Sequence, residues 1–179
     1  MVYDPVIQGR RYEFGVSGRL YRRNLLFLDR ETDSLWSQLL AEAVTGPMAG
    51  ARLAMLPAEN TTWKAWRMAH PNTLVLSFNT GYQRDYSHDP YAAEAIPRDP
   101  ALFVSAAGVN RIYPFSELKK AREPVAFDAG HSVTITYDRQ AQTARVEGAA
   151  AAGVSYFAAF LADLKALYPE AEIYRARRK

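Results

Sequence analysis

The apolar residues of this chain come in short runs, and each run is followed by a turn-forming or proline-containing segment. Leu25–Leu28, Leu102–Val104 and Val133–Tyr137 are too short for typical helices but match the length of strands. Because strands joined by tight turns pair antiparallel, this pattern favours an antiparallel sheet. We therefore predict an α+β fold of mostly antiparallel sheet with two or three helices.

Several strands and strand pairs can be placed from local signals. Val6–Ile7 and Arg11–Phe14 flank a Gln8-Gly9-Arg10 turn, which predicts a hairpin. Thr73–Leu76 is an apolar run that predicts a central strand. The other expected strands share the same signals: Leu35–Leu40, Ala51–Leu56, Leu102–Val104 paired with Val109–Tyr113, Val125–Phe127, Val133–Tyr137 paired with Thr143–Glu147, and Ile173–Tyr174.

Three helices are expected. The first contains Trp63 and Trp66, has Asn60, Thr61 or Thr62 as its N-cap, and ends at His70-Pro71. A second, short helix runs from Pro114 to Lys120. The third runs from about Val154 to Leu167, and its predicted buried stripe consists of Phe157, Phe160, Leu161, Leu164 and Tyr168.

Length and composition indicate one soluble domain over residues 1–179. The apolar fraction of 49% is typical of a folded protein, and the net charge of +3 lies partly in the tail Arg175–Lys179, so we expect no nucleic-acid partner. The absence of cysteine excludes disulfides and thiol catalysis within this chain. We expect no membrane span, because no apolar stretch reaches about 18 residues, and Met1–Pro5 does not resemble a signal peptide.

Two parts of the chain resemble each other. A hairpin, a helix, an aromatic-proline stop and a strand occur in residues 1–80 and again in residues 101–179, which predicts a partial duplication. The first copy carries an insertion at 16–57, and an irregular loop at 78–100 separates the copies. The first copy has no counterpart of Leu102–Ile135, so we expect an exposed strand edge at Tyr3–Phe14 through which the chain could form a homo-oligomer.

A polar stretch from Asp29 to Gln38 has two interpretations. In one it is a packed turn, with Trp36 in the core and with Ser37 and Gln38 bonded to backbone groups. In the other its side chains bind a ligand, and the Arg30 guanidinium donates two hydrogen bonds to an anionic or carbonyl group. The predicted ligand-binding residues of this stretch are Arg30, Thr32, Trp36, Ser37 and Gln38.

The loop from Gly81 to Tyr91 is the second candidate site. Its predicted ligand-binding residues are Tyr82, Arg84, Asp85, Tyr86, Asp89 and Tyr91. In one interpretation the tyrosines only fix the loop, and in the other the loop is a lid over the Asp29–Gln38 stretch. Asp85, His88 and Asp89 are candidate metal ligands, but three such residues in a loop are common, so no metal or other cofactor is predicted.

Several segments resemble the bacterial and archaeal domain-of-unknown-function family 3179. They are Tyr12–Tyr21, Asp29–Gln38, His70–Ser77, Arg84–Tyr86 with Asp89–Tyr91, and Arg111–Phe115, and together they cover nearly the whole chain. The resemblance implies no established activity. Members typically carry a Cys-Pro-Leu-Cys motif upstream of the equivalent of Tyr3, which suggests redox or metal chemistry, and they are often secreted or lipid-anchored.

This chain departs from that pattern because it begins after the motif and has no cysteine. It is either a fragment or late-start copy, or a member of a branch that lost the cysteine pair. The resemblance implies an extracytoplasmic location for full-length relatives.

The leading functional hypothesis is a binding or accessory domain for a small ligand or a partner protein, with a polar and aromatic pocket. One alternative is a redox- or metal-dependent enzyme whose reactive segment lies outside this chain, and another is a structural or assembly domain. No nucleophile elbow, catalytic triad or dinucleotide fingerprint is present, so no catalytic residue is predicted.

Overall fold

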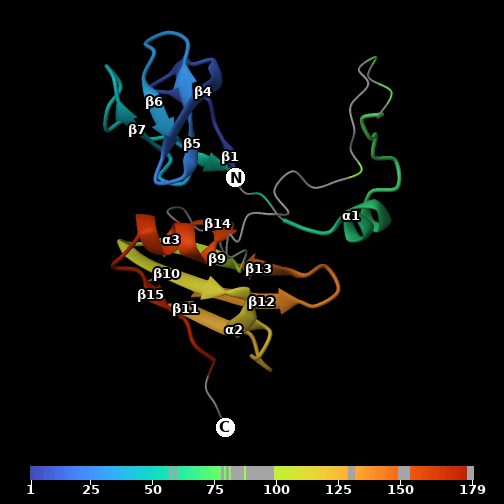
Figure 1. Cartoon of the computed structure of the whole chain (residues 1–179). Coiled ribbons are helices and arrows are strands. Elements are labelled where there is room, and N and C mark those ends of the chain that lie inside the picture. The colour runs from blue at the N-terminus through green and yellow to red at the C-terminus, as the bar shows by residue number, and fades with distance from the viewer. Residues whose placement is uncertain are drawn as a thin grey trace.

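The chain folds into two lobes and a separate helix. The computed structural model describes residues 1–56, 58, 60–77, 79, 81, 87, 99–128, 132–148 and 154–176. Residues 1–56 form the N-terminal lobe, residues 99–176 form the C-terminal lobe, and α1 (Trp63–Ala69) lies to one side of both (Figure 1). Nearly all described strand pairs are antiparallel, which confirms the predicted α+β fold of mostly antiparallel sheet.

The N-terminal lobe is built on a four-stranded antiparallel meander. Its strands are β4 (Phe14–Tyr21), β5 (Asn24–Asp29), β6 (Leu35–Ser37) and β7 (Glu42–Thr45). Two short pairs complete the lobe: β1 (Val2–Tyr3) with β8 (Met55–Leu56), and β2 (Val6–Ile7) with β3 (Arg10–Arg11). One cluster of buried side chains lies within the lobe and is made of Ile7, Tyr12, Trp36, Ala43 and Leu53.

The C-terminal lobe contains two sheets that pack against each other. The first has the strand order β14-β9-β10-β15 and is made of β14 (Ser155–Phe160), β9 (Pro100–Ala106), β10 (Val109–Pro114) and β15 (Glu172–Ile173). Only its β10–β15 pair is parallel. The second sheet is β11 (Val125–Asp128), β12 (Ser132–Asp138) and β13 (Thr143–Glu147), and the helices of the lobe are α2 (Phe115–Leu118) and α3 (Leu161–Leu167).

Strand β9 is apolar on both faces because both faces are covered. Leu102 and Val104 pack in the cluster between the two sheets, whereas Ala101 and Phe103 belong to a second cluster on the opposite face, under α3. Successive side chains of a strand point to opposite faces, so an uninterrupted apolar run is what a strand buried on both faces requires. Leu39 of the N-terminal lobe belongs to that second cluster and joins the lobes through apolar contact.

Local signals predicted most of the described elements correctly. The β2–β3, β9–β10 and β12–β13 pairs are confirmed. Helix α1 starts after Thr62, whose Oγ1 accepts a hydrogen bond of 3.3 Å from the backbone N–H of Ala65, and ends at His70. A short N-cap side chain and a following proline act within a few residues, so these bounds do not depend on distant contacts.

The predicted helix from Val154 to Leu167 is wrong in its first half. Ser155–Phe160 is strand β14, and the helix occupies only Leu161–Leu167. The spacing of Phe157, Phe160, Leu161 and Leu164 matches a helical stripe, but β14 pairs with β9 along its whole length. The cost of leaving the edge of β9 unpaired outweighs the helical periodicity, and Phe160 is consequently exposed rather than buried.

The predicted central strand at Thr73–Leu76 is also wrong. These residues belong to no strand, and the side chain of Leu74 is 95% exposed. An apolar run becomes a strand only where another strand lies beside it, and no described strand is paired with this one. Thr73–Leu76 is therefore an exposed apolar segment next to α1.

The predicted duplication and the domain bounds derived from it stay predictions. The N-terminal edge is partly covered, since Val2–Tyr3 pairs with Met55–Leu56 and Val6–Ile7 pairs with Arg10–Arg11. Homo-oligomer formation through that edge also stays a prediction.

Candidate functional site

The Asp29–Gln38 stretch is a turn organised around a buried carboxylate. Asp29 is fully buried and accepts hydrogen bonds from the backbone N–H of Thr32 at 2.6 Å, from Thr32 Oγ1 at 2.7 Å and from Trp36 Nε1 at 2.7 Å. A buried charge is tolerated only when such donors replace its hydration. Trp36 is fully buried as well, so its indole lies in the core of the N-terminal lobe.

A second set of contacts connects this turn to the strand that follows. Ser34 Oγ lies 2.6 Å from Thr32 Oγ1 and accepts a hydrogen bond of 3.0 Å from the backbone N–H of Met48. Gly46 has a φ of +94°, and a Cβ atom there would lie 2.6 Å from Ser34 Oγ. The stretch thus uses Thr32, Ser34 and Trp36 to hold its own backbone and that of the β7 region.

Of the five predicted residues in this stretch, only Gln38 lines a cavity that joins the two lobes. Trp36 and Thr32 bond to Asp29, and Ser37 Oγ accepts a hydrogen bond of 3.3 Å from the backbone N–H of Leu40. Arg30 is exposed, with its Nε 4.0 Å from Glu13 Oε2. The structure therefore does not bring Arg30 and Trp36 together around one hollow.

The second candidate site lies outside the described residues. This applies to Tyr82, Arg84, Asp85, Tyr86, Asp89 and Tyr91, and to the candidate metal ligand His88. A lid over the Asp29–Gln38 stretch stays a prediction. Among the residues that the structure does describe, no group of three His, Asp or Glu side chains could hold a metal ion, and no helix is long and apolar enough to span a membrane.

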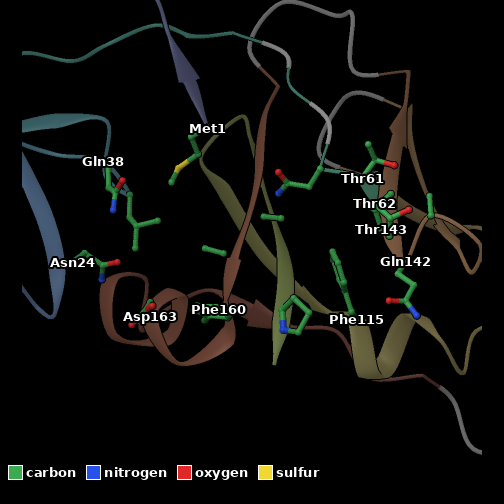
Figure 2. Close-up of a pocket in the computed structure, with 16 residues that line it drawn as sticks. Met1, Asn24, Gln38, Thr61, Thr62, Phe115, Gln142, Thr143, Phe160 and Asp163 are labelled. Atoms are coloured by element: carbon green, nitrogen blue, oxygen red, sulfur yellow. The ribbon is translucent and has the colours of Figure 1, made fainter. Parts of the chain in front are cut away.

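The cavity at Gln38 has a volume of about 470 Å³ and extends across the end of β14. Figure 2 shows Asn24 and Gln38 on one side, Gln142 and Thr143 on the other, and Phe160 between them. Small side chains on β14, at Ala158 and Ala159, leave this space open. The remaining lining residues come from several segments: Met1, Leu39, Asn60, Thr61, Thr62, Pro100, Phe115, Ala141 and Asp163.

Uncharged hydrogen-bonding groups dominate the polar part of this cavity. The side-chain amides of Gln38, Asn60 and Gln142 line it and make no hydrogen bond to any residue that the structure describes. Asp163 is the one carboxylate among the lining residues of this cavity, and its Oδ1 lies 3.3 Å from Arg23 Nη2. An amide offers both a donor and an acceptor, so the cavity suits a ligand that carries both kinds of group.

Two tyrosines fix the backbone of the Gln38 wall. Tyr3 of the N-terminal lobe donates its hydroxyl to the carbonyl of Gln38, and Tyr168 of the C-terminal lobe donates to the carbonyl of Leu39 at 2.7 Å. Burial raises the pKa of Tyr168 to about 12. Burial also raises the pKa of Tyr3, and the nearby Tyr168 hydroxyl raises it further. Both hydroxyls therefore stay protonated and remain donors at neutral pH.

The β4–β5 turn holds the opposite end of the same wall. Arg22 and Arg23 both have positive φ, 47° and 67°, which costs a non-glycine residue about 1–2 kcal/mol. The turn is held against α3, because Arg22 donates to the carbonyl of Ala166 and Arg23 pairs with Asp163. These contacts place Asn24 at the cavity.

Most of the cavity residues could not be found from the sequence. Asn24, Asn60 and Gln142 are isolated polar residues in or beside turns, where such residues are common. No spacing connects them, since they line one cavity only when the lobes and the segment between them pack together. The tertiary structure alone assigns them to the same cavity.

Comparison with protein-family models identifies a family for this chain. The family model described as "Protein of unknown function (DUF3179)" matches residues 1–167, which confirms the resemblance noted from the sequence. The searches of curated proteins and of solved structures gave no match. Because the family model covers most of the 179 residues, the chain belongs to the DUF3179 family of proteins of unknown function.

Proposed function

We propose that this protein is a binding domain that holds an uncharged, extended segment of polypeptide in the cavity between its lobes. The observation that carries the proposal is the set of three side-chain amides, Gln38, Asn60 and Gln142, that line the cavity without a described partner. Primary amides match the alternating donors and acceptors of a peptide backbone. The volume of about 470 Å³ is within the usual range of binding sites, roughly 300–1,000 Å³.

The position of β14 supports a peptide over a compact molecule. This strand lies at the edge of its sheet and pairs only with β9 among the described strands. Ala158, Ala159 and Phe160 of β14 line the cavity, so a bound chain could add to the free edge of the strand by backbone hydrogen bonds. Leu39 and Phe160 supply apolar surface for its side chains.

The charge of the lining residues supports an uncharged ligand. Asp163 is already paired with Arg23, so a cationic group would compete with an existing ion pair. Desolvating a charged side chain against amides and apolar walls is costly without a partner of opposite sign. We expect peptides with apolar and amide side chains to bind better than charged ones.

The test is an NMR titration of the protein with blocked hexapeptides that contain only uncharged side chains, beside matched peptides that contain Lys or Asp. The expected result is chemical-shift changes at Gln38, Ala159 and Gln142 with the uncharged peptides. Gln38→Leu should weaken binding by about fivefold to tenfold, which corresponds to one hydrogen bond of roughly 1 kcal/mol.

Gln140→Leu is the matched control, because Gln140 is exposed on the β12–β13 turn and does not line the cavity. It should bind peptides like the unchanged protein. The proposal is wrong if the shifts map outside the cavity, or if Gln38→Leu and Gln140→Leu bind the peptides equally well.

A further inference from the structure

Helix α1 and the segment that follows it form an apolar unit with no described partner. We call Trp63–Leu76 the helix–strand unit, although its Thr73–Leu76 part is paired with no described strand. No residue of α1 is buried, and Trp63, Leu74 and Leu76 are 50%, 95% and 88% exposed. Trp66, Met68 and Val75 are exposed too. Six large apolar side chains exposed within one short segment favour an interaction site.

The C-terminal lobe contains a second unit of the same local geometry, Leu161–Tyr174. Both helices have seven residues, and the residues that end them, His70 and Tyr168, have φ/ψ of −130°/72° and −124°/66°. Each of these residues donates its backbone N–H to the helix at 2.8 Å, to Trp66 and Leu164 respectively. Each also accepts from the third residue after it, at 3.1 and 3.0 Å. The two units therefore share a helix and the turn that ends it, and only the C-terminal unit continues into a paired strand, β15.

The C-terminal unit shows what such an element packs against. Leu164 of its helix is fully buried, Tyr168 stacks on Phe103 of β9 at a centroid distance of 4.2 Å, and Ile173 pairs with Ile112 of β10. Its receptor is therefore the β9–β10 hairpin. In the N-terminal unit, Trp66 and His70 occupy the positions of Leu164 and Tyr168, and their rings contact each other at a centroid distance of 3.9 Å with a tilt of 34°.

The N-terminal lobe has a hairpin with an uncovered apolar face. Val16 and Leu20 of β4 are 76% and 67% exposed, and Leu25 of β5 is exposed beside them. An apolar hollow of about 360 Å³ adjoins them, with Phe14 and Phe27 among its lining residues. Strand β4 is the edge of its sheet, since β5 is its only described neighbour.

We propose that the helix–strand unit of one molecule docks on the β4–β5 hairpin of a second copy of this chain. Each molecule carries one donor surface and one receptor surface, so a reciprocal exchange about a two-fold axis gives a closed dimer. In Figure 1, α1 lies apart from the β4–β5 hairpin of its own chain. The hollow also borders Tyr3 and Pro5, next to the N-terminal edge at which the sequence predicts self-association.

The helix–strand unit supplies large side chains for such a contact. A standard interface buries about 800 Å² on each partner, and one aromatic side chain alone can bury roughly 150–250 Å². The reciprocal dimer uses the donor surface twice, with two tryptophans in each unit.

The charges near both surfaces predict an unusual salt dependence. The helix–strand unit carries Lys64 and Arg67, and the hairpin carries Arg19, whereas Arg22 and Arg23 at its tip already bond to α3. Like charges repel across the contact, and added salt screens this repulsion. Sodium sulfate should therefore strengthen the dimer, because it also favours apolar burial.

The first experiment is sedimentation equilibrium of the full chain and of variants with a charge in either surface. The unchanged protein should be a dimer, and Val16→Glu and Leu74→Glu should each weaken dimerisation by at least tenfold. Their melting temperatures at low concentration should match, because both side chains are exposed in the isolated molecule. Val109→Glu, at an exposed apolar position of β10, is the control and should leave the dimer intact.

The second experiment uses the absence of cysteine in the chain. A Val16→Cys protein and a Val75→Cys protein, mixed under mild oxidation, should form a disulfide-linked heterodimer several-fold faster than Val75→Cys mixed with Gln140→Cys. Equal rates for the two mixtures contradict the proposed contact. A protein that stays monomeric at high concentration and high salt also contradicts it, as does a dimer that neither charged variant weakens.

Discussion

The hydroxyl of Tyr168 donates a hydrogen bond of 2.7 Å to the backbone carbonyl of Leu39, across the contact between the two lobes. The Leu39 side chain lies in the cluster beneath α3, while the ring of Tyr168 stacks on Phe103 in the same cluster. One turn of the N-terminal lobe is thereby held by both a polar and an apolar contact. Gln38, the residue before Leu39, lines the candidate cavity.

Tyr168→Phe should lower the free energy of unfolding by about 1 kcal/mol, because it removes this bond and leaves the ring stacking in place. Urea denaturation measures the change. Tyr21→Phe, at an exposed tyrosine, is the control and should change it little. An unchanged midpoint for Tyr168→Phe would show that the bond does not hold the lobes together.

Stability should decrease in alkaline solution because burial raises the pKa of Tyr168 to about 12 from an unfolded value near 10. The folded protein holds this proton more tightly than the unfolded chain does. The contribution is therefore complete below pH about 10 and is lost as the pH rises from there through the folded pKa. Thermal unfolding between pH 8 and 12 measures it, and Tyr168→Phe should show a shallower decline than the unchanged protein.

Asp29→Asn should destabilise the N-terminal lobe by about 2–3 kcal/mol. The new amide group would direct a donor at groups that already donate, namely Thr32 and Trp36 Nε1. Asp33→Asn, at an exposed position of the same turn, should change stability by less than about 0.5 kcal/mol. The quenching of Trp36 fluorescence during denaturation reports on both variants, and equal midpoints would argue against a structural role for the buried carboxylate.

Gly46→Ala should cost about 2–4 kcal/mol, because the backbone there has a φ of +94° and a Cβ atom would lie 2.7 Å from the Cα of Ser34. Gly50→Ala separates the cost of backbone strain from the cost of the steric clash. Gly50 has a φ of +85°, but a Cβ atom there would have no neighbour within 4 Å, so only the backbone strain of about 1–2 kcal/mol applies. Circular dichroism melts of both variants measure the difference, which should vanish only if Ser34 can move away.

The Asp29–Gln38 stretch shows how much of a side chain's role can be predicted from residue types alone. Its composition indicates that the stretch does more than reverse the chain. The hydrogen bonds to Asp29 show that Thr32 and Trp36 have a structural role in the turn. Residue types do not say whether Thr32 and Trp36 face a ligand or the carboxylate three or seven positions earlier in their own turn. Gln38 reaches the cavity because Leu39, next to it, is anchored in the other lobe.

The family, three of the antiparallel hairpins and the bounds of α1 follow from the sequence by itself. They depend on contacts a few residues apart, such as the Thr62 cap and the turns at Gly9 and Gly108. The tertiary structure alone decided that Ser155–Phe160 is a strand and that Thr73–Leu76 is not, because a strand exists only where a second one accepts its hydrogen bonds. The cavity was decided in the same way, since Gln38, Asn60 and Gln142 line one cavity only because the two lobes and the segment between them pack together.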